Sequence, residues 1–259
     1  GLTDEPDEAR DERTAFSPLG IRSPAGDPGA DPEVAAGTRR VQDEGSQLAA
    51  LALSRVRPAA AGERWLDLCA GPGGKAALLA AEARNASATL TANEAVPARA
   101  ELVRRALAPV DPAITVRVGD GRTIAGDAGG PFDRVLVDAP CTGLGALRRR
   151  PEARWRKTAA DVAPLAMLQA ELLTAALDAT APGGVVAYVT CSPHLAETRD
   201  VVAAVLGARD DAVTIDTPAV LSEIVRSPLD LGARGDAAQL WPHRHTSDAM
   251  FIQLIERRA

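Results

Sequence analysis

The sequence has few cysteines, almost no lysine and no long apolar run free of charges. Its three cysteines, Cys69, Cys141 and Cys191, are odd in number and too few for a disulfide framework. They also lack the close spacing of a zinc site, so we expect no bound metal and a reducing, cytoplasmic environment. No charge-free apolar stretch reaches the roughly 18 residues of a membrane span, and no signal-peptide pattern opens the chain. We attribute the scarcity of lysine to compositional bias.

The net charge of −6 by itself argues against binding to nucleic acid, but its distribution does not. Of the chain's 35 acidic and 29 basic residues, 11 acids and 5 arginines lie in residues 1–47, and the 24 of each sign that remain cancel. Within this neutral part, residues 148–157 (RRRPEARWRK) carry six positive charges and one negative charge. Both a solvated loop and a phosphate-binding patch fit this run.

Three regions with different patterns follow one another. Residues 1–33 are rich in Asp, Glu, Pro, Gly and Ala without periodicity, which predicts a flexible acidic arm or linker. Residues 34–62 read as a helical lead-in, with an apolar face that includes Leu48 and Leu51. Residues 63–259 are long enough for one catalytic domain, and a hydrophobic content of 46% allows a buried core.

The region 63–259 alternates between strand and helix signals. We predict strands at 64–69, 89–93, 115–119, 134–138, 185–190, 212–216 and 249–255, and helices at 75–84, 97–107, 164–180 and 196–206. Strands that alternate with helices indicate βαβ units. The sequence therefore predicts an α/β fold with a mostly parallel, seven-stranded sheet covered by helices on both faces.

The segment LDLCAGPGGK (66–75) predicts a strand, a glycine-rich turn and the start of a helix. Its glycines let a ligand approach the backbone, and a helix start offers free N–H groups. The spacing is not GxGxxG, so a dinucleotide fold is not indicated. The turn fits the amino-acid part of S-adenosylmethionine, but a purely structural turn fits it as well. Glu94 and Asp120 follow the next two strands, where an acid can bind a ribose or an adenine amino group, or simply cap a turn.

Two further predicted strands each end in a loop that carries a cysteine. These are FDRVLVDAPCTG, with Cys141, and GGVVAYVTCSP, with Cys191. If the strands are neighbours in a parallel sheet, the thiols share one cleft at its carboxyl edge. A thiolate is a strong nucleophile, and a positive neighbour such as Lys75 would favour it, whereas packing as a small apolar residue is the alternative role. Spacing alone leaves the two thiols interchangeable.

These motifs resemble those of the Sun/Fmu-type RNA 5-methylcytosine methyltransferases. The similarity covers about residue 41 to the end, in the segments VQDEGSQLAA, LDLCAGPGGK, ANE, GDGR, DAPCTGLGALRRRPEARW, PGGVVAYVTCSP and LWPHRHTSDAMF. The pair DAPC(S/T)G and TCS is highly specific for this family. The resemblance implies the class I S-adenosylmethionine-dependent methyltransferase fold, which is Rossmann-like. It also implies methylation of carbon 5 of a cytosine in RNA, with small-subunit (16S) ribosomal RNA as the expected substrate.

The resemblance further implies a role for each matching residue. Cys191 would be the nucleophile, and Cys141 would act in product release or as a base. Asp138 would touch both cofactor and target base, and Lys75 completes the expected catalytic set. The expected cofactor-binding residues are Cys69, Ala70, Gly71, Pro72, Gly73, Gly74, Lys75, Glu94, Asp120 and Asp138. The basic run supplies the expected RNA-binding residues Arg148, Arg149, Arg150, Arg154, Trp155 and Arg156.

The chain departs from the family pattern in a few places. Ala70-Gly71 stands where the family more often has two alanines, and Ala249-Met250 replaces the usual Gly-Phe; we expect little effect from either. Residues 1–40 are too short for the helical RNA-binding domain that usually precedes the catalytic domain. We therefore expect that domain either to be absent from this homologue or to precede residue 1.

Other functions remain open on the sequence alone. The same chemistry on tRNA or another RNA is one alternative, and a non-catalytic RNA-binding assembly protein with this fold is another. DNA cytosine methyltransferases and amine methyltransferases would carry ENV-type or NPPY-like segments, which are absent. We expect a monomer.

Overall fold

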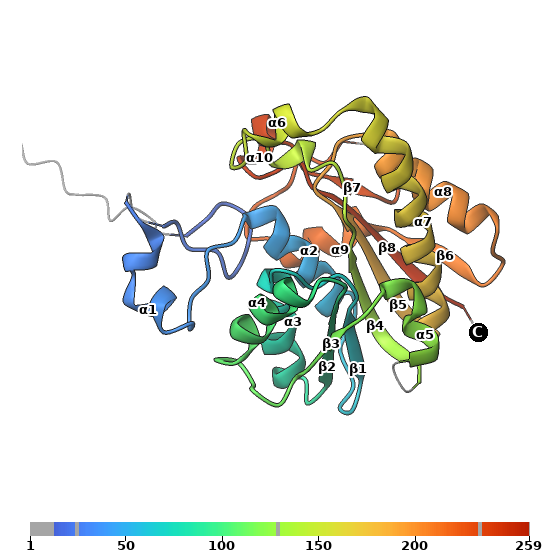
Figure 1. The fold of residues 1–259 in the computed structure, drawn as a ribbon, viewed down its shortest axis with the longest axis horizontal. Helices are drawn as coiled ribbons and strands as arrows, with labels where there is room; N and C mark the ends of the chain where they lie inside the picture. The colour runs from blue at the N-terminus through green and yellow to red at the C-terminus, as the bar shows by residue number, and fades with distance from the viewer. Residues whose placement is uncertain (1–12, 24–25, 128–129, 233–234, 259) are drawn as a thin grey trace, which may run out of the picture.

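The structure, a computed structural model, describes residues 13–23, 26–127, 130–232 and 235–258. A mixed sheet with strand order β3-β2-β1-β4-β5-β8-β6 forms its centre (Figure 1). The strands are β1 (Arg64–Asp67), β2 (Thr89–Glu94), β3 (Thr115–Val118), β4 (Phe132–Asp138), β5 (Thr180–Thr190), β6 (Ala212–Ile215) and β8 (Phe251–Arg257), with a two-residue strand β7 (Ala238–Gln239) beside β8. Strands β1 to β5 run parallel, and β8 is antiparallel to β5 and β6. This confirms the predicted class I methyltransferase fold.

Helices cover both faces of the sheet (Figure 1). One face carries α2 (Glu44–Ser54), α3 (Gly74–Asn85), α4 (Pro97–Leu107) and α9 (Thr217–Ile224), and the other carries α5 (Ile124–Asp127), α7 (Val162–Ala179) and α8 (Arg199–Gly207). Three short helices, α1 (Pro32–Ala35), α6 (Ala153–Arg156) and α10 (Pro242–His245), lie in the connections. The predicted doubly covered sheet is therefore present.

Alternate residues of the central strands enter two different hydrophobic clusters. In β4, Leu136 belongs to the cluster that includes α2 and α3, whereas Val135 and Val137 belong to the cluster that includes α7 and α8. Burial on both faces explains the continuous apolar runs in the sequence. Among the described residues, 159–179 is the one stretch long and apolar enough to cross a membrane. Its main part, α7, packs on β4, β5 and α8 as a core helix.

The predicted lead-in region contains α2, and one helix farther along the chain was not predicted. Helix α2 begins only after Asp43, whose carboxylate accepts from the Gly45 N–H, and Gly37 before it adopts a left-handed φ of 77°. Helix α9 lies between the predicted strands at 212–216 and 249–255, where we predicted no helix. Its signals are Asp216, which caps the Ala219 N–H, and a proline in the first turn.

Part of the predicted arm packs against α2. The backbone N–H groups of Phe16 and Ser17 donate to Glu44 Oε1 at 2.7 and 2.6 Å, and the buried Ser17 hydroxyl donates to Gln47. Residues 1–12 lie outside the described residues. The division into an arm, a helical lead-in and a catalytic domain at 1–33, 34–62 and 63–259 stays a prediction.

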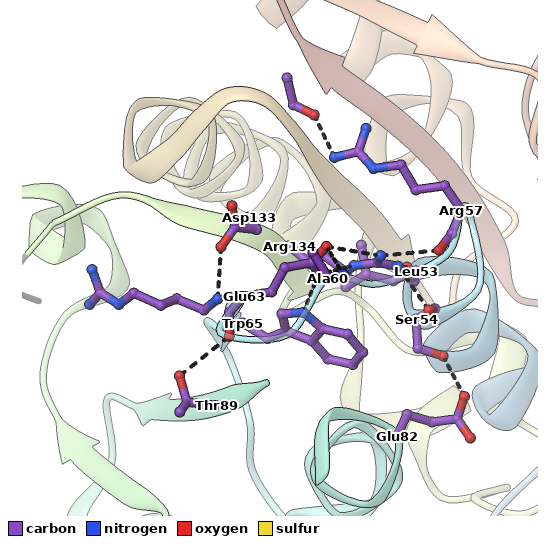
Figure 2. A network of polar contacts seen from close by, with 12 residues as sticks. Leu53, Ser54, Arg57, Ala60, Glu63, Trp65, Glu82, Thr89, Asp133 and Arg134 are labelled. Atoms are coloured by element: carbon purple, nitrogen blue, oxygen red, sulfur yellow. Dashed lines mark hydrogen bonds and ion pairs between the residues drawn. The ribbon is translucent and has the colours of Figure 1, made fainter. Parts of the chain in front are cut away.

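A fully buried arginine joins α2 to the sheet (Figure 2). The guanidinium of Arg134, near the start of β4, donates to Glu63 at 2.7 Å and to the backbone oxygens of Leu53 and Ser54 at 3.0 and 2.8 Å. It also lies 5.0 Å from the ring centroid of Trp65. The two carbonyls belong to the last turn of α2, where oxygens lack helical partners and attract a cation.

We predict that Arg134→Met lowers the free energy of unfolding by about 3–5 kcal/mol, because it leaves the Glu63 carboxylate without its buried partner. Arg55→Met is the matched control. Arg55 pairs with Glu82 at 2.8 Å, but the Arg55 side chain is 37% exposed, so a loss under about 1 kcal/mol is expected. Urea denaturation measures both. Equal losses would contradict a special role for the buried arginine.

Candidate functional site

The predicted site residues gather at the carboxyl ends of the parallel strands. The glycine turn follows β1, Glu94 ends β2 and Asp138 ends β4. Cys141 and Cys191 follow β4 and β5, which are neighbours in the sheet. Ligands of open α/β sheets bind at this edge, because neighbouring loops there diverge and leave a crevice.

The glycine turn is closely packed against the end of β2. Gly73 caps α3 with a left-handed φ of 106°, and no side chain caps the first N–H groups of that helix. A Cβ at Gly71 would collide with the Glu94 carboxylate, and one at Gly73 would collide with Ala106. The turn therefore requires glycine at both positions, and it presents bare backbone at a helix N-terminus.

Glu94 is buried and fixes the turn. Its carboxylate accepts from the Gly71 and Val96 N–H groups, each at 3.0 Å. The Arg99 guanidinium lies 3.5 Å from the same carboxylate and donates to the Gly71 carbonyl at 2.6 Å. Glu94, which we predicted to bind the ribose, thus already uses part of its hydrogen-bond accepting capacity to hold the turn in place.

Asp67, the last residue of β1, was not among the predicted site residues. It is 1% exposed, and neither carboxylate oxygen has a hydrogen-bond partner among the described residues. Burial, reinforced by the negative charge of Asp138, raises the pKa of Asp67 to about 8. The available signal was an acid inside the apolar run LDLC. A buried carboxylate without partners marks a place where a ligand donor would fit.

Lys75 and Asp138 form an ion pair beside the cysteines. Lys75 Nζ, from the first turn of α3, lies 2.8 Å from Asp138 Oδ2, and both side chains are largely buried. Burial alone would lower the pKa of Lys75, but the charge and hydrogen bond of Asp138 outweigh it, so the pKa is raised. Lys75 therefore remains a cation within the site.

The two predicted catalytic thiols meet. Cys141 Sγ and Cys191 Sγ are 3.4 Å apart. The hydrogen bond between them and then burial raise the pKa of Cys141, whereas the same hydrogen bond lowers the pKa of Cys191 against the effect of burial. The charge of Lys75 also favours the Cys191 thiolate. The pair is thus asymmetric, and Cys191 is the thiol that ionises first.

Other predicted cofactor residues occupy different surroundings. Burial, and then the charge of Asp67, raises the pKa of Cys69, so its thiol stays protonated. Ala70 is buried, Pro72 is exposed and Gly74 is half-buried. Asp120 follows β3 but is half exposed, and its carboxylate binds Arg122 at 2.6 Å. These hydrogen bonds lower the pKa of Asp120.

The basic run divides into two parts. Arg148 pairs with Asp43 at 3.1 Å and Arg149 pairs with Asp248 at 2.5 Å, and both aspartate side chains are buried. These two arginines therefore tie the run to α2 and to the loop before β8. The other four predicted RNA-binding residues are exposed: Arg150, Arg154, Trp155 and Arg156. The Trp155 side chain is 82% exposed, and the Arg154 guanidinium lies 5.5 Å from its ring centroid.

Residues 56–256 match the family model of the 16S rRNA methyltransferases RsmB/F. The chain belongs to this family. RsmB/F methyltransferases depend on S-adenosylmethionine. Within the described residues, no group of three or more His, Cys, Asp or Glu side chains is arranged to hold a metal ion.

Curated relatives of the chain are named as methyltransferases. A protein of Mycobacterium tuberculosis named as a methyltransferase is 53% identical over 242 residues, 93% of this chain and 51% of that protein. The ribosomal RNA small subunit methyltransferase B of Salmonella typhi is 38% identical over 187 residues, 72% of this chain and 42% of that protein. The chain thus spans about half the length of the curated relatives it matches.

Two solved structures from Pyrococcus horikoshii share the fold. A methyltransferase homolog protein has a TM-score of 0.73 at 24% identity and covers 92% of this chain and 74% of its own. NSun6 has a TM-score of 0.73 at 21% identity and covers 93% of this chain and 60% of its own. At these identities the likeness concerns the fold alone.

We predict that iodoacetamide alkylates Cys191 before Cys141, with a pH midpoint below the roughly 8.5 of a free thiol. Lys75→Met should raise that midpoint, because the cation that stabilises the thiolate is lost. Lys157, the other lysine of this RsmB/F-family chain, is exposed, and Lys157→Met should leave the midpoint unchanged. Peptide mapping by mass spectrometry gives the rate at each cysteine. Faster alkylation of Cys141 would contradict the asymmetry.

Proposed function

We propose that the chain methylates carbon 5 of a cytosine in RNA, with S-adenosylmethionine as methyl donor and small-subunit ribosomal RNA as substrate. The observation that carries the proposal is the pair of thiols, Cys141 and Cys191, 3.4 Å apart at the sheet edge that also holds the glycine turn. Two thiols suit this chemistry because one must add to the base and the product must later be released from it.

The residues at the edge fit the cofactor. Gly71 and Gly73 leave bare backbone next to the free N–H groups of α3, which suits a carboxylate. Asp67 offers a buried carboxylate without partners, which suits an ammonium group. Glu94 is the acid for the ribose hydroxyls, and Asp120 is assigned to the adenine side. When bound, S-adenosylmethionine supplies an electrophilic methyl group on a sulfonium.

Cys191 starts the reaction in this proposal. Carbon 5 of cytosine is a poor nucleophile while the ring is aromatic, and addition of the Cys191 thiolate to carbon 6 makes carbon 5 enamine-like. Carbon 5 can then accept the methyl group. Asp138 lies beside Lys75 and would hold the cytosine edge, where a proton or hydrogen bond at ring N3 favours the addition.

Cys141 acts in the second half of the reaction. The methylated adduct must lose the proton on carbon 5 and expel the Cys191 thiolate, which restores the aromatic ring. Cys141 Sγ lies within 3.4 Å of the departing sulfur, and we assign it to this release. The raised pKa of Cys141 keeps it protonated until then, so it does not compete with Cys191 for carbon 6. In the release step Cys141 would pass its thiol proton to the departing Cys191 sulfur and take up the carbon 5 proton in its place.

The exposed part of the basic run is the proposed RNA contact. Arg150, Arg154 and Arg156 offer charges to phosphates, and Trp155 offers a ring on which an unpaired base can stack. Arg148 and Arg149 hold the run in place through Asp43 and Asp248. We propose that the protein acts in the cytoplasm as a monomer.

The proposal predicts methyl transfer to small-subunit ribosomal RNA. The protein, incubated with radiolabelled cofactor and either that RNA or a tRNA pool, should label the ribosomal RNA, and bisulfite sequencing should locate the 5-methylcytosine. Labelling of tRNA instead would move the substrate within the same chemistry. Cofactor binding shown by calorimetry, without transfer to any RNA, would contradict the enzymatic proposal and leave a binding protein.

The two thiols should respond differently to substitution. Cys191→Ala should abolish both methyl transfer and the covalent protein–RNA adduct, because nothing adds to carbon 6. Cys141→Ala should accumulate the adduct, because release fails. Denaturing gel electrophoresis with labelled RNA detects the adduct. Cys69→Ala is the matched cysteine control and should form no persistent adduct. Wild-type behaviour of Cys141→Ala would contradict the release role.

A further inference from the structure

Glu197 lies in the connection between β5 and α8 that also carries Cys191, and its carboxylate contacts the Cys141 loop as well. It is fully buried at the end of a short 3₁₀ helix before α8. Its Oε2 accepts from the Ser192 hydroxyl at 2.6 Å and from the Thr142 hydroxyl at 2.5 Å, and its Oε1 accepts from the Thr142 N–H at 2.7 Å. Thr142 directly follows Cys141, and Ser192 directly follows Cys191. One carboxylate therefore binds the residue next to each thiol.

The surrounding core holds Glu197 itself in place. Gln169 of α7 donates to Glu197 Oε1 at 3.3 Å and to the Pro140 carbonyl at 2.8 Å. The Tyr188 hydroxyl of β5 donates to the Glu197 carbonyl at 2.8 Å. Gln169, Tyr188 and Glu197 all have no exposed surface. Contacts from α7 and β5 thus hold Glu197 in addition to those from the two loops.

A buried carboxylate is stable only if donors surround it, and here most donors come from the two catalytic loops. The loops are also joined by the Gly145 N–H, which donates to the Cys191 carbonyl at 2.9 Å. That link lies on the main chain of the Cys191 loop. The Glu197 contacts instead hold the Thr142 and Ser192 side chains at one carboxylate. They therefore restrain how closely the two neighbouring sulfurs can approach each other.

We propose that Glu197 is a positioning residue that holds the Cys141 and Cys191 thiols together for addition and release; its part in catalysis rests on the proposed function. Glu197 acts through Thr142 and Ser192 and contacts neither sulfur. Its effect on the thiols exists whether or not RNA is the substrate, which makes it measurable in the protein alone.

The rate at which a disulfide forms between the two thiols measures how readily their sulfurs come together. One thiolate attacks the disulfide reagent dithiobis-nitrobenzoate and expels one thionitrobenzoate, which leaves a mixed disulfide on the protein. The second thiolate then attacks the protein sulfur and expels a second thionitrobenzoate. The reagent is reduced as the pair is oxidised to a Cys141–Cys191 disulfide. With sulfurs 3.4 Å apart, the wild-type mixed disulfide should be short-lived.

Glu197→Ala should slow closure by about tenfold or more, so that mass spectrometry detects a persistent mixed disulfide. Glu197→Gln should close at an intermediate rate. Its amide oxygen can still accept from the Thr142 N–H, and the Thr142 and Ser192 hydroxyls can rotate to accept from its NH₂ group. If the Glu197 side chain merely filled space, Glu197→Gln should close at the wild-type rate, because Gln and Glu are nearly the same size. An intermediate rate would therefore exclude a space-filling role.

Methyl transfer gives the second readout. Glu197→Ala should lower kcat by about 100-fold, in line with a small misplacement of reacting groups, with KM for RNA and cofactor little changed. If wild type fails to methylate RNA but the closure rates still follow Glu197, the proposed function fails and the positioning role stands. If wild type methylates RNA but substitution of Glu197 does not change the rate of disulfide closure, only the positioning role fails.

Glu63→Gln is the control for loss of a half-buried carboxylate that accepts several hydrogen bonds away from the thiols. Glu63 accepts from Arg134 and from the Trp65 indole, both at 2.7 Å, near the start of β1 and β4 and so at the opposite edge of the sheet (Figure 2). The variant should lower stability yet leave closure and kcat unchanged. If Glu197→Ala does not fold, the closure rates of Glu197→Gln and Ser192→Ala test the proposal instead. Closure at the wild-type rate in both variants would overturn it.

Discussion

The parallel pairing of β4 with β5 is the constraint on which the site depends. Asp138 lies opposite Val189, and the Ala139 N–H donates to the Val189 carbonyl at 2.9 Å. Both strands consequently end at the same level, and the loops that follow deliver Cys141 and Cys191 to the same place. A shift of one residue in this register would turn each side chain to the other face of the sheet and separate the loops.

Segments distant in sequence stabilise this edge of the sheet by forming hydrogen bonds to one another's polar groups. Asp43 caps α2 through the Gly45 N–H, and the same carboxylate accepts from Arg148 and from the Asp248 N–H. Burial raises the pKa of Asp43, with the charge of Asp248 adding to the effect. In the basic run, Arg148 and Arg149 are thus paired with buried acids and support the lead-in helix, and the remaining positions are the proposed phosphate contacts.

The fold and the thiol pair were predictable because they depend on local patterns. Apolar β-branched runs mark the strands, and the turn after β1 needs glycine at positions 71 and 73 whatever surrounds it. Asp67 and Glu197 were not predictable. An acid in a sequence is normally exposed, and only the tertiary structure shows that Asp67 lacks partners while Glu197 has several. The division of the arginines was not predictable for the same reason, since it depends on which acids reach them.

Charge at the edge favours a cationic ligand beside the thiols. Asp138 and Asp67 lie near the ammonium of Lys75 and raise its pKa although burial opposes them. A carboxyl with a pKa of about 8, as in Asp67, is mostly protonated at neutral pH and becomes a carboxylate when a cation lies next to it. A sulfonium compound with an ammonium group supplies such a charge, and its sulfur loses its charge once the methyl group has gone. Bound at the proposed site, the methyl donor would therefore interact more strongly with these acids than the product that remains after transfer.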